Sequence, residues 1–177
     1  GSVAVCENGN YYNRFYFVYP DGAVQHYDKK HLFTFGGEHK RFTAGTERVV
    51  VNFRGVRILL EVCYDLRFPV WARNLGDYDM ILYVASWPTP RVDAWSALLR
   101  ARAIENQCYV AGVNRMGVDP ACEYSGGSAI IDPYGKTIAE CPWSRESAVS
   151  ADIDMEALQA FRKKFPVLDD ADPFTLI

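Results

Sequence analysis

Cys63 is the residue of this sequence best placed to act as a nucleophile. It ends an apolar run, Ile58–Val62, and is followed by the segment Tyr-Asp-Leu-Arg-Phe-Pro. A nucleophile at a sharp strand-to-helix junction is exposed at the end of a sheet, where the next backbone N–H, that of Tyr64, can contribute to an oxyanion hole. Glu61 has the same strand parity as Cys63, so the two side chains could face the same side, but a paired structural carboxylate is the favoured interpretation of Glu61. Taken alone, such a cysteine is more often a small buried hydrophobic residue, and the other four cysteines are interpreted that way.

A thiol needs a nearby cation or base to become a thiolate, and a basic segment could supply one. Lys29 and Lys30 follow a predicted strand and precede His-Leu-Phe. A desolvated lysine beside a thiol would promote the thiolate and stabilise an oxyanion. Glu38, in the irregular segment that follows, is a candidate orienting or proton-transfer group if it is buried beside Lys29. The ordinary alternatives are a solvated basic surface and an exposed loop glutamate.

Three further residues are candidates for binding a substrate. Trp87 and Arg91 bound a proline-containing segment that follows a predicted buried strand, and they could provide an aromatic wall and a guanidinium for a carboxylate. Arg67 follows the nucleophile candidate closely, as does Asp65. The alternatives are a rigid connection for the first segment and, for Asp65 and Arg67, pairing with each other or support of the turn.

Many short strand patterns surround these residues, and a few helical patterns lie between them. Two hairpins are predicted, at Tyr11–Tyr19 with Ala23–Tyr27 and at Arg48–Phe53 with Val56–Cys63. Further strands are predicted at Met80–Ala85, Tyr109–Asn114, Ser128–Asp132, Thr137–Cys141 and Ala148–Ile153. Helices are predicted at Pro69–Leu75, at Val92–Gln107 and from the Asp154 cap to Lys164. This alternation favours a layered α/β arrangement over an all-β sandwich.

The composition is that of one soluble globular domain. The chain has 177 residues, of which 49% are hydrophobic and 23% charged, and its net charge of -3 with mixed signs argues against a nucleic-acid partner. No apolar run approaches the ~18 residues that cross a bilayer, and no signal peptide is visible, so no membrane partner is expected. Five cysteines without paired spacing favour reduced thiols in the cytoplasm. His26, His31 and His39 lack the spacing of a zinc site, which makes a metalloenzyme the least favoured alternative.

Together and in this order, the motifs resemble the nitrilase superfamily of carbon–nitrogen hydrolases. The matching stretches are Tyr27–Phe33, Gly37-Glu38 with Gly45, Cys63–Pro69, Arg102–Gln107 and Asp132–Gly135. They span nearly the whole chain, and the match at Cys-Tyr-Asp-Leu-Arg-Phe-Pro is the most specific. Within the superfamily the sequence is most similar to the omega-amidase branch, whose substrates are short ω-amides of dicarboxylic keto acids.

The resemblance implies an αββα four-layer sandwich and a Glu–Lys–Cys triad without metal or organic cofactor. Cys63 matches the nucleophile, Lys29 the lysine, and Glu38 a second glutamate often found close to the triad. In the superfamily the triad glutamate lies before the strand that resembles Gly1–Cys6. We therefore expect residues 1–177 to be the C-terminal portion of a carbon–nitrogen hydrolase domain, with a sandwich that is incomplete at its N-terminus.

The expected function is hydrolysis of a small carboxylate-bearing ω-amide through a cysteine thioester, with release of ammonia. The resemblance also implies a homo-oligomer, a dimer or larger, in which a tail such as Pro166–Ile177 often crosses to a partner subunit. The alternative function is a catalytically silent fragment or degenerate relative that acts as a binding or assembly module. That alternative draws on the position of the triad glutamate, without which this chain alone would be inactive.

Overall fold

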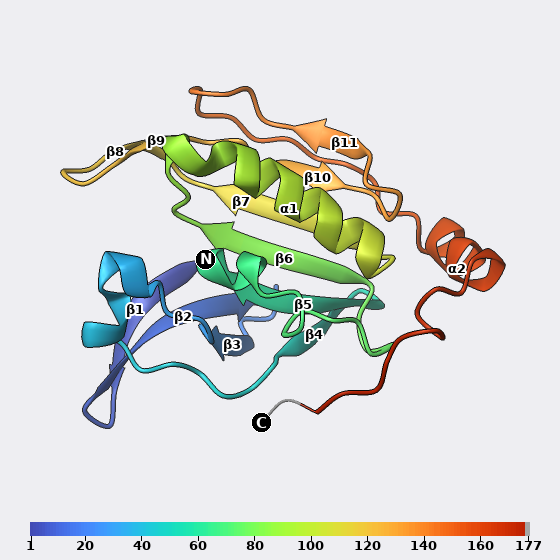
Figure 1. Cartoon of the computed structure of the whole chain (residues 1–177), viewed down its shortest axis with the longest axis horizontal. Coiled ribbons are helices and arrows are strands. Elements are labelled where there is room, and N and C mark those ends of the chain that lie inside the picture. Colours follow the sequence, from blue (N-terminus) through green and yellow to red (C-terminus); the bar gives the residue numbers. More distant parts are fainter. Residues whose placement is uncertain (176–177) are drawn as a thin grey trace.

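A six-stranded sheet forms the framework of the molecule (Figure 1). Cys63 directly follows one of its parallel strands. The computed structural model describes residues 1–175. Three parallel strands form the centre of the sheet: β5 (Val56–Val62), β6 (Met80–Ala85) and β7 (Tyr109–Asn114). Three antiparallel strands flank them: β4 (Val50–Phe53) on one side, and β10 (Ala129–Ile131) with β11 (Thr137–Glu140) on the other. Because parallel strands end at the same edge, the segments after β5, β6 and β7 converge there.

A three-stranded antiparallel sheet covers one face of this larger sheet. It consists of β1 (Ser2–Glu7), β2 (Asn10–Val18) and β3 (Val24–Asp28). Phe15 and Tyr27, which are partners in the β2–β3 ladder, pack with Leu60 and Val62 of β5 in one buried cluster. Alternate residues of a strand point to opposite faces, which is why the even-numbered residues of β5 face this sheet.

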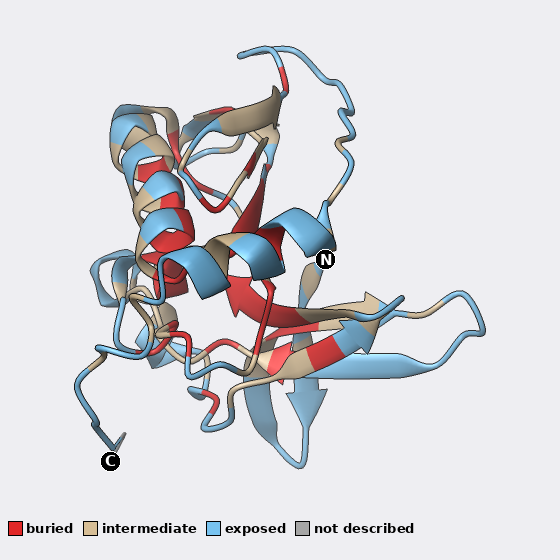
Figure 2. Ribbon diagram, turned by 90° about the vertical axis from the view of Figure 1, so that its right-hand side faces the viewer, coloured by how far each residue is buried: buried red, intermediate tan, exposed pale blue. Residues whose placement is uncertain are grey.

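Helix α1 (Val92–Glu105) covers the opposite face of the larger sheet. Its buried residues Trp95, Leu99 and Ala103 recur every four positions and pack with Leu59 of β5, among other strand residues. At Gly112 of β7 a Cβ atom would lie 2.6 Å from a methyl group of Leu99, so glycine is what permits the close approach of α1. Figure 2 shows the buried residues gathered on the inner face of α1 and on the central strands.

The second helix, α2 (Met155–Lys164), begins at Asp154, whose side chain accepts a hydrogen bond from the N–H of Ala157. Arg162 then ties α2 to the start of β6 through Asp79, at 2.9 Å. Four short 3-10 helices complete the described elements, together with a small hairpin: η1 (Thr34–Gly36), η2 (Glu38–Lys40), η3 (Cys63–Arg67), η4 (Thr89–Arg91), β8 (Met116–Val118) and β9 (Glu123–Ser125). Within residues 1–175 no helix is long and apolar enough to cross a membrane.

Most of the predicted elements are confirmed, and two are wrong. Pro69–Leu75 forms no helix, because its backbone groups are satisfied in other ways; the N–H of Asn74, for example, donates to the side chain of Asn106. Ala148–Ile153 forms no strand among the described residues, since it is largely exposed and has no neighbouring strand with which to pair. The β8–β9 hairpin was not predicted.

Candidate active site

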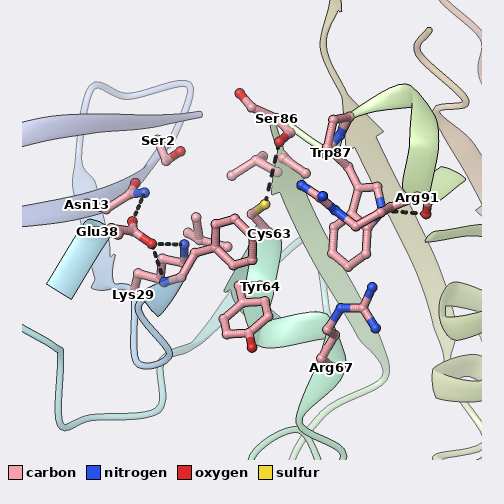
Figure 3. A pocket seen from close by; sticks show the side chains of 15 residues that line it. Ser2, Asn13, Lys29, Glu38, Cys63, Tyr64, Arg67, Ser86, Trp87 and Arg91 are labelled. Atoms are coloured by element: carbon pink, nitrogen blue, oxygen red, sulfur yellow. Dashed lines mark hydrogen bonds and ion pairs between the residues drawn. The ribbon is translucent and has the colours of Figure 1, made fainter. Parts of the chain in front are cut away.

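A pocket of about 240 Å³ opens where the parallel strands end. The seven residues proposed from the sequence all line it: Cys63, Lys29, Glu38, Tyr64, Arg91, Trp87 and Arg67. Figure 3 shows Lys29 and Glu38 on one side of Cys63, and Trp87, Arg67 and Arg91 on the other. The pocket therefore has two chemically different ends, with the thiol between them.

The backbone at Cys63 has a left-handed conformation, with φ = 49°. A side chain other than glycine is strained there, and such strain collects at functional sites. The strain follows from the sharp turn at which β5 ends and the 3-10 helix η3 begins. The sulfur atom lies 3.9 Å from the backbone carbonyl oxygen of Ser86, which follows β6. Burial raises the pKa of the Cys63 thiol, although the ammonium of Lys29 and the contact with Ser86 act to lower it.

Lys29, which is buried, and Glu38, which is partly buried, form an ion pair with Nζ 2.6 Å from Oε2. Lys29 is only 3% exposed, so the interpretation of this segment as solvated surface is wrong for Lys29. The same carboxylate also accepts hydrogen bonds from the side chain of Asn13, at 3.0 Å, and from the N–H of Phe33, at 2.6 Å. Burial alone would raise the pKa of Glu38, but Lys29 and these two donors hold it below its usual value. Glu38 is thus an anchored anion and a weak proton acceptor.

Arg67 and Arg91 each lie over an aromatic ring at the other end of the pocket. The guanidinium carbon of Arg67 is 5.1 Å from the centre of a Trp87 ring, and that of Arg91 is 5.4 Å from the centre of the Phe33 ring. Trp87 is itself fixed by a hydrogen bond from Nε1 to the carbonyl oxygen of Arg91, at 2.7 Å. Within residues 1–175 neither guanidinium forms an ion pair, so both retain donors for an anion.

Two carboxylates close to Cys63 in the sequence do not line the pocket. Asp65 does not pair with Arg67: it is fully buried and binds His31 and Tyr27 at the turn, the second of the two alternatives. Glu61 does not share the pocket with Cys63, because the strand alternation ends where the left-handed Cys63 turns the chain. The side chain of Glu61 is buried, and neither of its oxygen atoms has a hydrogen-bond partner among the described residues.

Sequence reasoning missed Asn13 and Ser86, which also line the pocket. Asn13 has the same strand parity as Phe15 and Phe17 of β2, which pack in the core. A polar residue in this inward-facing row of aromatic residues was the signal that could have identified it. Ser86 could have been found from its place directly after β6, at the same edge as Cys63. In the part of the chain that the structure describes, no group of three or more His, Cys, Asp or Glu residues could hold a metal ion.

Known proteins resemble this chain in sequence and in structure. The family model described as Carbon-nitrogen hydrolase matches residues 1–163. Omega-amidase YafV of Escherichia coli (strain K12) is 53% identical over 177 residues, which cover 99% of this chain and 69% of that protein. The 2-oxoglutaramate amidase of Bacillus subtilis (strain 168) is 42% identical over 173 residues, 96% of this chain and 66% of that protein.

Among solved structures, XC1258 from Xanthomonas campestris superposes with a TM-score of 0.97 at 47% identity. The match covers 100% of this chain and 70% of that one. It is a CN-hydrolase superfamily protein whose crystal structure contains an arsenic adduct in the active site. The predicted fold, an α/β sandwich of the nitrilase type, is confirmed by this likeness.

Proposed function

Because this chain belongs to the carbon–nitrogen hydrolase family, we propose that it hydrolyses the amide bond of a small ω-amide that carries a carboxylate. One observation carries the proposal: a single small pocket combines a strained cysteine, a largely buried Lys29–Glu38 ion pair and two guanidinium groups that form no ion pair with any described residue. An omega-amidase and a 2-oxoglutaramate amidase among the relatives support this class of substrate.

The substrate is proposed to lie across the pocket from the arginines to the thiol. Arg91 binds the carboxylate with its guanidinium donors, Arg67 adds a second positive charge, and Trp87 forms the apolar wall between them. Glu38 neutralises Lys29, so the charge that remains at the far end is that of the two arginines. A short dicarboxylic monoamide fits this distribution, because its amide then reaches Cys63.

In the first step, the sulfur of Cys63 forms a bond to the amide carbon, and the carbonyl oxygen becomes an oxyanion. Lys29 and the backbone N–H of Tyr64 stabilise that charge. The thiol must give up a proton, since burial raises its pKa. We assign Glu38 the role of holding Lys29 in place. Its carboxylate does not take up the thiol proton, because three hydrogen-bond donors already hold it as an anion. In the nitrilase superfamily the proton acceptor is a glutamate that precedes the strand matching Gly1–Cys6.

In the second step, the C–N bond breaks and ammonia leaves with the proton that the base accepted, which produces a thioester on Cys63. Water then attacks the thioester carbon, releases the carboxylic acid product and restores the thiol. No step of this route requires a metal or an organic cofactor.

A second candidate function is binding without turnover. The raised pKa of the thiol and the lowered pKa of Glu38, whose carboxylate accepts three hydrogen bonds, favour it, because neither group alone can start the reaction. A binding module would retain the ω-amide, as titration calorimetry would detect, without releasing ammonia.

The activity is tested by measuring ammonia release from a short dicarboxylic monoamide by the full-length protein. Cys63→Ala should abolish the release, and Cys122→Ala, a free cysteine outside the pocket, should leave it unchanged. Equal rates for wild type and Cys63→Ala would refute the proposal.

We also propose a cytoplasmic homo-oligomer, a dimer or larger, built from one carbon–nitrogen hydrolase domain over residues 1–177. All five cysteines are free, which suits a reducing compartment. Ile104, Tyr134 and Phe165 line one apolar groove and are more than half exposed, which suits burial against another subunit. Light scattering after size exclusion would measure the oligomer size.

A further inference from the structure

Asp65 receives hydrogen bonds from two separate segments of the chain. Its side chain is fully buried, in the 3-10 helix η3 that begins at Cys63. From its own turn, the N–H of Val62 donates to Oδ2 at 3.0 Å. From β3 and the loop after it, the hydroxyl of Tyr27 donates to Oδ2 at 2.9 Å, and His31 donates to Oδ1 through both its backbone N–H and Nδ1, each at 2.8 Å.

Each of the two segments carries one member of the proposed catalytic pair. Lys29 lies between Tyr27 and His31, and Cys63 lies between Val62 and Asp65. The carboxylate is therefore a shared anchor of the segment with the cation and the segment with the nucleophile. We propose that Asp65 is a positioning residue that holds Lys29 in place next to Cys63. This inference rests on the proposed function, in which these two residues act together.

The residues around Asp65 make the anchor rigid. The hydroxyl of Tyr27 also accepts hydrogen bonds from the N–H of Lys30, at 3.1 Å, and from Nε1 of Trp71, at 3.2 Å. The imidazole of His31 stacks on the ring of Phe68, with centroids 3.7 Å apart and an interplanar angle of 3°. The stack keeps Nδ1 of the imidazole directed at Asp65.

Only a carboxylate can serve all these donors. An asparagine in place of Asp65 has one acceptor oxygen, and its NH₂ group would face donors on the other side. A buried donor without an acceptor is destabilising, so the loop that carries Lys29 would shift to satisfy its N–H groups.

Two effects of Asp65 on the thiol have opposite signs, which makes the inference testable. As a negative charge, Asp65 disfavours the thiolate of Cys63. As a positioning residue, it favours the thiolate, because it keeps the ammonium of Lys29 close. Removing the charge alone would therefore move the ionisation of Cys63 to lower pH, whereas losing the position of Lys29 would move it to higher pH.

The test is the pH profile of iodoacetamide alkylation at Cys63, followed by mass spectrometry of the Cys63 peptide in the full-length protein. For Asp65→Asn we expect the profile to move to higher pH, with about a tenfold slower reaction at neutral pH for each unit of displacement. Ammonia release should show a lower kcat with KM within about twofold of wild type. A profile that is unchanged, or moved to lower pH, would overturn the inference.

Asp79→Asn is the matched control. Asp79 is also a buried carboxylate with several donors, from Arg57 and Arg162, but it precedes β6 at the opposite end of the sheet. It should lose stability without any displacement of the alkylation profile. A displacement as large as that of Asp65→Asn would mean that general loosening causes it, and the inference would fail.

Tyr27→Phe decides the question if Asp65→Asn does not fold. It removes one donor to Asp65 and the acceptor of the Lys30 N–H, and should move the profile in the same direction by a smaller amount. No displacement in Tyr27→Phe would then count against the inference. Alkylation reports on the thiol alone and does not depend on ammonia release. If the wild-type protein releases no ammonia but both variants move the alkylation profile, the proposed function is refuted. The positioning role of Asp65 would still stand.

Discussion

The ammonium of Lys29 lies 2.6 Å from the carboxylate of Glu38, and both groups line the pocket that contains the thiol of Cys63. Burial removes the water that would solvate the ammonium of Lys29, and the carboxylate of Glu38 compensates for that loss. The pair therefore has two consequences, one for stability and one for the oxyanion that Lys29 is proposed to stabilise.

Glu38→Gln should destabilise the protein by about 2–4 kcal/mol above pH 5, because it leaves the charge of Lys29 buried without its partner. The folded-state pKa of Glu38 is lowered, so its contribution is present above the ordinary glutamate value, ~4.3. It is lost as the pH falls through the folded-state value, and the difference between wild type and variant should shrink there. Urea denaturation of both proteins, from neutral pH down through the folded-state pKa of Glu38, measures this difference in the free energy of unfolding. Glu7→Gln, which removes a half-exposed carboxylate from Arg14 while Asp28 remains its partner, should change the midpoint little.

Arg91→Ala should raise KM for a carboxylate-bearing ω-amide by about 10- to 100-fold, the effect of losing a charge-assisted hydrogen bond. The value of kcat should change much less, because Arg91 lies at the other end of the pocket from the Lys29–Glu38 pair. The neutral amide of the same length is the control substrate, and Arg91→Ala should leave its kinetics unaltered. Equal losses for both substrates would remove Arg91 from carboxylate binding.

Cys63→Gly and Cys63→Ala should both be inactive but differ in stability. Alanine retains the cost of the left-handed conformation at this position, where φ is 49°, and glycine relieves it. We expect the glycine variant to be more stable by about 1 kcal/mol in denaturant titrations. A more stable alanine variant would argue against a strained turn at Cys63.

Glu61→Leu should stabilise the protein at neutral pH by about 1–3 kcal/mol, because no described residue satisfies its buried oxygen atoms. Burial raises the pKa of this carboxyl well above the ordinary value, with Asp65 adding to the effect. Wild-type stability therefore falls as the pH rises from the ordinary value towards the folded-state value. The advantage of Glu61→Leu should grow over the same interval, and a constant difference between pH 4 and 8 would contradict this account.

The strands were predictable because their alternation is local. Phe15 and Tyr27 face the core in the way that the period of two requires, and Trp95, Leu99 and Ala103 follow the helical period. The ordered motifs were enough to predict seven residues that line one pocket. Residues close in sequence determine the strand and helix patterns, whereas the shared pocket of the seven candidates followed from the family resemblance of the ordered motifs.

Other features depend on contacts between distant segments, which no local pattern reveals. Pro69–Leu75 has a helical sequence, but the side chain of Asn106 accepts the hydrogen bond of the Asn74 N–H. Glu38 could be an exposed loop acid or the partner of Lys29, and only the fold of the loop after β3 decides. Glu61 does not face the pocket, because the strand ends at Val62 and its alternation does not continue through Cys63.

The central claim, a thioester on Cys63, is tested most directly by acid-quenching the full-length protein during turnover of a short dicarboxylic monoamide and measuring its mass. We expect an adduct equal to the substrate minus ammonia, located on the peptide that contains Cys63, and no adduct in Cys63→Ala. An adduct on another residue, or ammonia release by Cys63→Ala at the wild-type rate, would contradict the claim.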